Sequence, residues 1–534
     1  MGGLSLTTLD WVVCMTALVG SIVAGLWLSA RAHSTESSAG FFLAGRKLKW
    51  PVIGASLFAT NIGAEHLVGL SGDSYRYGLC AGTVELTTAM CLGFTAAVLL
   101  PYYMKNQIFT IPEFLEIRYN RSARTVFSGL MLVICIMTKT AFTLYAGALV
   151  LNHLTHWDLM TTVVCLGIIT AIVTMIGGFT TVAYTDTIQT VIMLIGSGVM
   201  VMLGLSKIGG WSGLMAAAPE AMHMAKPLTD PNYPFWGVIA GAIYGGIFYW
   251  GMDQVNVQRM LGGRDLKQAR WGAMFAVLLK LSPVFIFALP GVIAFALFPG
   301  RDAKSTFVTL LNELTPSGLR GLLLASLLAA MISSLLAIMN SISTLSVRDF
   351  LLRFKPEASE KTQVAVGRLT IVAGAALGIA AAYLISVTPD GLYKYLQTIS
   401  IYLVMPVTPA IAFGIMSKKV TLQGAFWSVV AGVGLASVYV TDQLMGAEWG
   451  AINLPWLHNT WTENYTFRGL WGTLLVIAVL FIVSAVTQKT DPEKLKRTTV
   501  DWQAKMERFE GWTDWRLHLA VLMLITVVLY RCVW

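Results

Sequence analysis

Apolar runs of about 20 residues recur along the whole chain, and short polar segments separate them. A run of this length forms a helix that crosses the hydrocarbon core of a bilayer. The pattern therefore predicts an all-α integral membrane protein with about fourteen transmembrane helices. The candidate runs begin near Leu9, Val52, Gly82, Thr125, Met160, Thr187, Trp236, Gly272, Gly318, Val366, Leu392, Leu422, Gly469 and Leu517.

The composition agrees with lipid as the main solvent of the folded chain. Of the 534 residues, 56% are hydrophobic and only 12% are charged, whereas soluble domains carry about 25% charged residues. The first apolar run, from Leu9 to Ala30, has no basic start and no clear cleavage site, so we keep it in the mature protein. No polar stretch is long enough for a soluble domain.

Basic residues are unevenly distributed between the loops. If the loop after the first run is cytoplasmic, the cytoplasmic loops hold 26 of the 37 Lys and Arg residues. Because cytoplasmic loops carry the excess of positive charge, this bias places both termini outside and favours an even number of spans. The net charge of +9 then reflects loop residues rather than a nucleic-acid partner. The compact loops suggest a bacterial plasma membrane.

The six cysteines lie in or near apolar runs and form no CxxC pair. Buried cysteines of this kind behave as small hydrophobic residues. We therefore interpret them as packing residues rather than as a disulfide framework or a metal site.

Several ionisable residues fall at membrane depth, where a charge is costly and needs a partner or a function. The two cations and four carboxylates among them can compensate each other, and a polar solute could share their network. The set comprises Glu65, His66, Glu85, Lys139, Asp186, Asp253 and Lys280.

The second span is interrupted by polar residues. It carries Asn61, Gly63, Glu65 and His66 near its middle, where a broken helix would account for them. Unwound carbonyls can hold a cation, and freed helix ends can face a polar solute. A kinked but continuous helix is the alternative.

The seventh span repeats this pattern in the Gly-rich run 241–254. It lies five spans after the second, the offset that two inverted five-helix repeats would give. Tyr249 and Trp250 could stack on a sugar ring, and an interfacial aromatic belt is the alternative. In the ninth span, Ser333 and Ser334 offer hydroxyl ligands for a cation such as sodium, unless they bond the backbone or a neighbouring helix.

Several separated motifs, in this order, resemble the sodium/solute symporter family, and most closely its sodium–glucose and sodium–galactose cotransporters. They are the Phe-Leu-Ala-Gly-Arg stretch at 42–46, the segment 54–85, the Ile-Pro-Glu-Phe-Leu-Glu-Ile-Arg-Tyr run at 111–119, the Gly-Gly-Phe-Thr-Thr-Val-Ala-Tyr-Thr-Asp-Thr-Ile-Gln run at 177–189, the Tyr-Trp-Gly-Met-Asp-Gln-Val-Asn-Val-Gln-Arg run at 249–259 and the serine pair at 333–334. The resemblance runs from about residue 40 to residue 420.

The resemblance implies a LeuT-type fold. A leading helix and loop would occupy residues 1–48, an inverted-repeat transport core 49–420, and three additional helices 421–534. It also implies sodium-coupled symport of a glucose-like or galactose-like hexose by alternating access, with no enzymatic step. The partners would be sodium, the sugar and membrane lipid, and a monomer would suffice.

The resemblance further implies binding residues, position by position. The sodium ligands would be the carbonyls of Ala59, Ile62 and Ala330 and the hydroxyls of Ser333 and Ser334. The sugar-binding residues would be Asn61, His66, Glu85, Thr88, Lys280 and Gln397, with Tyr249 as the inner gate and Trp250 beside it. Asp186 would lie near the sodium route, and Lys139 and Asp253 are candidates for the surrounding network.

Two departures from the family pattern bear on the number of sodium ions and on the particular sugar. Leu336 and Ala337 stand where members that carry two sodium ions have hydroxyl residues, so we expect one sodium per solute, and Asp186 keeps the two-ion alternative open. Gly246 stands where a bacterial galactose carrier has a sugar-binding Asn, which leaves the particular sugar open.

Other functions remain as alternatives. Within the family, the solute could be inositol, sialic acid, an amino acid such as proline, or an organic acid, although Glu85, Lys280 and Gln397 suit hydroxyls that both donate and accept. A sensor would need a signalling domain, and an enzyme a nucleophile–base pair, HExxH or a phosphate loop, none of which the sequence shows. A passive channel would lack sodium-dependent accumulation.

Overall fold

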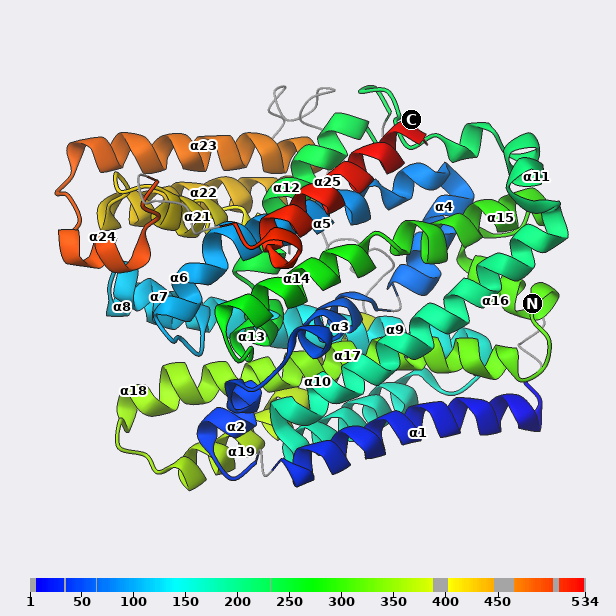
Figure 1. The fold of residues 1–534 in the computed structure, drawn as a ribbon, viewed down its shortest axis with the longest axis horizontal. Helices are drawn as coiled ribbons and strands as arrows, with labels where there is room; N and C mark the ends of the chain where they lie inside the picture. The colour runs from blue at the N-terminus through cyan, green and yellow to red at the C-terminus, as the bar shows by residue number, and fades with distance from the viewer. Residues whose placement is uncertain are drawn as a thin grey trace.

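The computed structural model describes residues 6–32, 35–63, 65–230, 232–387, 402–445, 465–502 and 509–532. In these ranges the chain is almost entirely helical, with one isolated β-bridge between Leu48 and Gly263 and no strand. Figure 1 shows the long helices lying roughly alongside one another, with α1 at one edge of the molecule and α23 at the opposite edge.

The helices have the following bounds. In the first half of the chain they are α1 Thr8–Arg31, α2 Ser38–Leu43, α3 Trp50–Asn61, α4 Ser71–Tyr77, α5 Thr83–Phe94, α6 Leu100–Lys105, α7 Ile111–Arg118, α8 Arg121–Val133, α9 Ala141–Thr155, α10 Leu159–Ile208, α11 Gly210–Ala217, α12 Phe235–Gly251 and α13 Gln254–Leu261. In the second half they are α14 Leu266–Lys280, α15 Leu289–Leu297, α16 Thr306–Leu314, α17 Leu319–Leu345, α18 Leu352–Phe354, α19 Glu360–Ser386, α21 Thr408–Met416, α22 Leu422–Met445, α23 Tyr465–Val486, α24 Pro492–Thr498 and α25 Trp515–Cys532. Wider π-helical turns lie at η2 Glu65–Leu70, η4 Thr95–Leu99, η5 Ile134–Thr140, η7 Val284–Ala288 and η9 Ser346–Leu351, and short 3₁₀ turns at Ala44–Arg46, Leu79–Gly82, Glu220–Met222, Ala303–Ser305 and Gly511–Thr513.

Nine helical segments in the described ranges are long and apolar enough to cross a membrane, or ten if α12 and α13 count as one bent span. One of the nine, α10, is 50 residues long and bends at Gly178, whose φ of 58° is strained for any other residue type. It therefore accounts for two of the predicted spans, and the second starts at this bend rather than near Thr187. The predicted span at Leu392 begins outside the described residues.

Two predicted interruptions are present. Helix α3 ends at Asn61, Ile62 has an extended backbone, and the helical path resumes at Glu65. Helices α12 and α13 meet at an angle of 50°, and the side chain of Asp253 caps α13 by accepting a hydrogen bond from the backbone N–H of Val255. The second and seventh spans are therefore broken helices, as their polar residues predicted.

Polar side chains cap the N-termini of helices just outside the apolar runs. Asn120 accepts from the N–H of Ala123 at the start of α8, and Asp158 accepts from the N–H of Thr161 at the start of α10. The donated N–H of Thr161 holds the pKa of Asp158 below its usual value. These caps fix where two of the spans begin.

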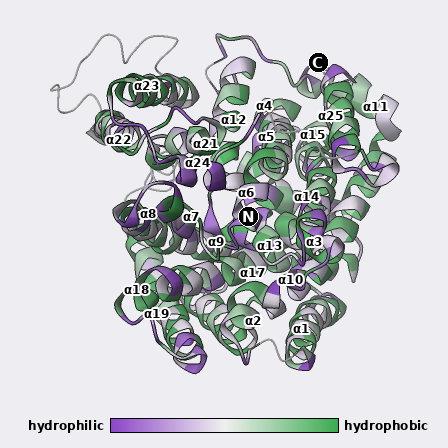
Figure 2. Ribbon diagram, turned by 60° about the vertical axis from the view of Figure 1, so that its left-hand side comes forward, coloured by the Kyte–Doolittle hydropathy of each residue, from purple (hydrophilic) through white to green (hydrophobic). Residues whose placement is uncertain are grey.

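The outer and inner helices differ in what they expose. Val126 on α8, Met202 on α10 and Ile482 on α23 are each about two-thirds exposed, as expected of side chains that face lipid. Figure 2 shows hydrophobic residues along the helices and hydrophilic ones gathered at turns such as those around α24 and between α18 and α19. Helix α17 is the opposite case, because 89% of the 18-residue apolar stretch in the segment Leu319–Phe354 is buried. It packs against α1, α3, α10 and α19.

Candidate functional site

A buried polar cluster forms where the broken end of α3 meets α5 and α14. The ammonium group of Lys280, the last residue of α14, contacts both the side-chain oxygen of Asn61 and the carboxylate of Glu85 on α5. His66 Nε2 lies 3.4 Å from the other carboxylate oxygen of Glu85. Lys280, Glu85 and His66 are all buried. Four predicted substrate residues are therefore in one place, and the charges of Lys280 and Glu85 compensate each other.

The aromatic pair on α12 lies against this cluster. Asn61 Nδ2 donates to the hydroxyl of Tyr249 over 3.2 Å, and the ammonium of Lys280 lies 5.9 Å from the ring centroid of Trp250. The two rings meet edge to face, with centroids 5.0 Å apart. The indole N–H of Trp250 is buried and has no hydrogen-bond partner among the described residues. Because Trp250 is buried and Tyr249 is partly buried against this cluster, the alternative of an interfacial aromatic belt is wrong.

Thr88 and Gln397 were also predicted to bind the substrate. The hydroxyl of Thr88 donates to the carbonyl of Glu85 in its own helix, 3.3 Å away, and can still accept a bond. Gln397 lies outside the described residues, so its role stays a prediction.

Gly246 allows α5 and α12 to approach closely. A Cβ atom at this position would lie 2.8 Å from Cys91 Sγ and 3.2 Å from the methyl carbon of Thr88. Contacts this short are repulsive. The absence of an Asn at 246 therefore has a packing reason in this chain.

Ser334 of the serine pair on α17 faces the unwound end of α3. Ser334 Oγ lies 3.1 Å from the carbonyl oxygen of Thr60 and 3.3 Å from that of Ile62. Ala59 and Ala330, whose carbonyls were also predicted as ligands, are fully buried on these two helices. Hydroxyl and carbonyl oxygens are the donors that hard cations prefer. The residues described contain no cluster of three His, Cys, Asp or Glu side chains that would suit a transition metal.

Ser333 turns instead toward Asp186 on α10. Its hydroxyl donates to Asp186 Oδ1 over 2.6 Å, while Ser56 Oγ donates to Asp186 Oδ2 over 2.5 Å. The guanidinium of Arg259 lies 3.6 Å from Oδ2 and donates through Nε to the hydroxyl of Thr60. This network joins α3, α10, α13 and α17.

Arg259, Thr60 and Ser56 were not predicted as members of this network. Arg259 follows a predicted span, where a loop residue is expected, whereas its side chain is fully buried in α13. The signal that could have found it is the Gln-Val-Asn-Val-Gln-Arg run, which places amides and a cation on a helix directly after a broken span.

A second ion pair, between a partly buried lysine and a buried carboxylate, lies beside Tyr249. Lys139, on the π-helical turn η5, contacts the carboxylate of Asp253, and its ammonium lies 5.6 Å from the centroid of the Tyr249 ring. Asn256 donates to the backbone carbonyl of Tyr249 over 2.9 Å. The break between α12 and α13 is thus tied to the helix that carries Lys139.

The broken spans, with hydroxyl and carbonyl oxygens at one break and a polar cluster beside it, define an ion-coupled secondary transporter. The chain belongs to the sodium:solute symporter family, whose model matches residues 41–432. It is therefore a multi-pass membrane transporter and not an enzyme, and its family implies sodium as the coupling ion.

Two curated relatives and one solved structure extend this assignment. Sodium/glucose cotransporter 4 of Danio rerio is 34% identical, over 96% of this chain and 84% of that protein. Sodium/myo-inositol cotransporter 2 of Homo sapiens is 33% identical, over 78% of this chain and 67% of that protein. A Na⁺-coupled sialic acid symporter in a substrate-bound outward-open state superimposes with a TM-score of 0.75 at 20% identity, over 90% of this chain and 99% of that one. The likeness confirms the predicted LeuT-type fold.

Proposed function

We propose that this protein couples one sodium ion to the transport of a neutral sugar or polyol, with a hexose as the first candidate. The observation that carries the proposal is the buried cluster of Asn61, His66, Glu85 and Lys280 beside Tyr249. Sugar hydroxyls both donate and accept, and an amide, an imidazole, a carboxylate and an ammonium offer both functions. Each group left unpaired by a wrong solute would cost about 1–3 kcal/mol.

The charge balance of the cluster favours a neutral solute. The ammonium of Lys280 already contacts the carboxylate of Glu85, so among the residues that the structure describes this cluster offers no unpaired ammonium to the carboxylate of an amino acid, an organic acid or sialic acid. Myo-inositol is the second candidate, because it has the same hydroxyl chemistry and a relative is named for it. Thr88 and Gln397 would add further hydrogen bonds to the solute.

Sodium would bind between the hydroxyls of Ser333 and Ser334 and the carbonyls of Ala59, Ile62 and Ala330. Support comes from Ser334, which already approaches the unwound end of α3. A single ion is favoured because the carboxylate of Asp186 is engaged by Arg259, Ser56 and Ser333.

Coupling would follow from three consecutive residues. The carbonyls of Thr60 and Ile62 face Ser334, and the side chain of Asn61 between them contacts Lys280 and Tyr249. Sodium held at the carbonyls would fix the position of Asn61 and so complete the solute site. A ligand shifts a conformational equilibrium only by binding one state better, and this shared turn provides that difference.

Tyr249 would close the route on the far side of the solute. Its ring lies under the ammonium of Lys139, and the Lys139–Asp253 pair ties the α12–α13 break to η5. Opening toward the cytoplasm would separate these groups after sodium and solute have bound. The cycle is therefore alternating access.

The proposed orientation has both termini outside and the protein in a plasma membrane, the inner membrane if the source is a bacterium. Support comes from α7, α8, α18 and α24, whose basic neighbouring segments lie together at one end of the molecule in Figure 1, away from the N-terminus.

Uptake into proteoliposomes tests the proposal. Labelled glucose, galactose and myo-inositol would be offered under an inward sodium gradient, or with potassium in its place, to wild type, Gln397→Ala and Ser334→Ala. Sodium-driven accumulation of one of these solutes that both variants lose supports both sites. Stabilisation by sodium without uptake of any of the three would discard the solute class, and no sodium effect at all would overturn the proposal.

A further inference from the structure

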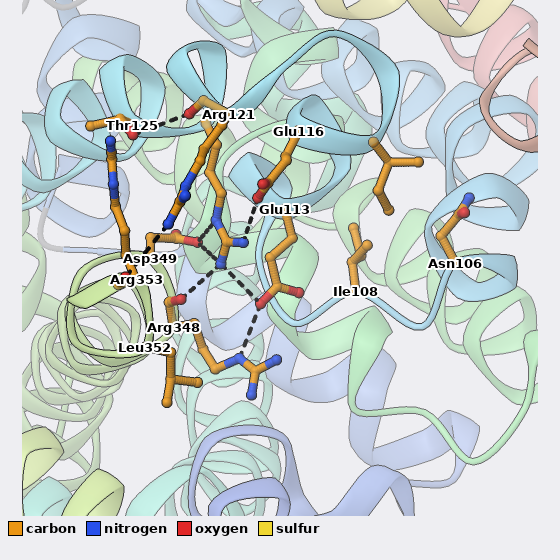
Figure 3. A pocket seen from close by; sticks show the side chains of 12 residues that line it. Asn106, Ile108, Glu113, Glu116, Arg121, Thr125, Arg348, Asp349, Leu352 and Arg353 are labelled. Carbon is orange, nitrogen blue, oxygen red and sulfur yellow. Dashed lines mark hydrogen bonds and ion pairs between the residues drawn. The ribbon is translucent and has the colours of Figure 1, made fainter. Parts of the chain in front are cut away.

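A cavity of about 370 Å³ lies apart from the transport site, among α7, α8 and the segment η9–α18. Figure 3 shows charged side chains of both signs converging on it. Its charged lining residues are Glu113, Glu116, Arg121, Arg124, Arg348, Asp349 and Arg353.

Two of the arginines contact all three carboxylates. Arg124 lies 2.7 Å from Glu116, 2.7 Å from Asp349 and 3.4 Å from Glu113, and Arg348 donates to Glu113 over 3.0 Å. The four guanidinium groups and three carboxylates leave the lining with a net positive charge.

The other two arginines have no acid partner. Within the described part of the chain, neither Arg121 nor Arg353 lies within 4.0 Å of a carboxylate. Arg121 makes only a long bond of 3.5 Å to the backbone carbonyl of Arg353. In Figure 3 the side chain of Arg353 reaches toward Thr125 on α8, while that of Arg121 reaches in the opposite direction. A guanidinium group without an acid partner suits a phosphate.

One acceptor in the lining is also unsatisfied. Asp349 Oδ1 accepts from Thr110 and Arg124, whereas the equally buried Oδ2 has no partner among the residues described. A hydroxyl group on the ligand would satisfy this oxygen. The site therefore suits a head group that carries both a phosphate and a hydroxyl.

The surroundings favour a lipid as the source of that head group. Val126, Val133 and Met137 are exposed on one face of the continuous α8–η5 helix, at spacings of seven and four residues. Phe354 is 76% exposed directly after Arg353. An acyl chain could follow this apolar face while the phosphate stays at the arginines.

We propose that this cavity binds an anionic phospholipid through its phosphate at Arg121 and Arg353 and through a head-group hydroxyl at Asp349. Phosphatidylglycerol has both features. Basic pockets between membrane helices at the cytoplasmic end are typical places for such head groups.

The test is native mass spectrometry of the purified full-length chain with phosphatidylglycerol, phosphatidic acid or phosphatidylcholine added. The variant is Arg121→Gln/Arg353→Gln, and the matched control is Lys355→Gln/Lys361→Gln, which removes two exposed cations near the cavity but outside its lining. We expect tight phosphatidylglycerol binding to weaken about ten-fold or more in the variant and to be unchanged in the control. Weaker binding of phosphatidic acid would support the hydroxyl contact.

Free phosphate is the other source of the same chemistry. The thermal midpoints of wild type and variant would be compared with inorganic phosphate, glycerol phosphate or phosphatidylglycerol, and their midpoints without ligand establish that both are folded. An arginine-dependent shift with the soluble phosphates, and none with the lipid, would contradict the lipid assignment. Equal lipid binding by wild type and variant would overturn the site itself.

Discussion

The ammonium of Lys280 contacts the carboxylate of Glu85 inside the membrane domain, and both side chains are buried. Removing one partner of such a pair leaves an uncompensated buried charge, which typically costs about 3–5 kcal/mol. The pair is therefore both a structural element and the centre of the proposed solute site.

These two roles can be separated by mutation. Glu85→Gln and Lys280→Gln should each lower the thermal midpoint, and the double variant should recover most of that loss because no unpaired charge remains. Unlike wild type, none of the three variants should accumulate the solute. If the double variant transports as well as wild type, the pair does not contact the solute.

Ser334→Ala should weaken sodium binding about ten-fold or more, because one oxygen ligand is lost. Sodium-dependent protection against thermal unfolding measures this directly, without any solute. Ser326→Ala is the matched control, since this buried hydroxyl of the same helix donates, within the described residues, to the carbonyls of Ile192 and Leu322. Equal loss of sodium protection in both variants would contradict the sodium site.

One sodium ion should move with each solute molecule. Simultaneous measurement of labelled sodium and labelled solute in proteoliposomes gives the ratio. The expected value is about one, because Arg259 balances the charge of Asp186. A ratio near two would mean that Asp186 holds a second ion despite this partner.

Asp253→Asn should loosen the closure around Tyr249, since it removes the charge that Lys139 contacts. Cys135, fully buried one turn before Lys139, reports on this opening. Its rate of alkylation, followed at the peptide level, should rise about ten-fold, which corresponds to about 1.4 kcal/mol. Alkylation of the exposed Cys165 should not change. An unchanged rate at Cys135 would contradict the gating role.

Gly246→Ala should destabilise the protein by about 1–3 kcal/mol, because the new methyl group meets Cys91. Adding Cys91→Ala should restore part of the loss. The thermal midpoints of Gly246→Ala, of the double variant and of Cys91→Ala alone would be compared with that of wild type. If Gly246→Ala is as stable as wild type, close packing is not the reason for glycine at this position.

Much of the architecture could be predicted because it depends on local patterns. Apolar runs define the spans, and Asn61, Gly63 and Glu65 in mid-span predicted the break that the structure has after α3. The family and the LeuT-type fold followed from motifs in the right order and are confirmed by the comparisons.

Other features depend on tertiary geometry that no local pattern carries. Which carbonyls of the turn face Ser334 depends on the rotation of α3 about its axis, and the structure adds that of Thr60. Arg259 lies in a polar segment after a span, where a loop residue is the usual interpretation, yet its side chain folds inward to Asp186. Gln397 and the sodium and solute ligands stay predictions.

The turn at residues 60–63 also limits how this carrier could be re-engineered. Two of its carbonyls face Ser334, its Asn61 side chain reaches Lys280 and Tyr249, and its Gly63 N–H donates to the ring of His66. A library aimed at a new cargo that varies this turn would change ion binding together with selectivity. Randomising Thr88 on α5 instead leaves the turn intact, so it offers a route to altered selectivity with the driving force preserved.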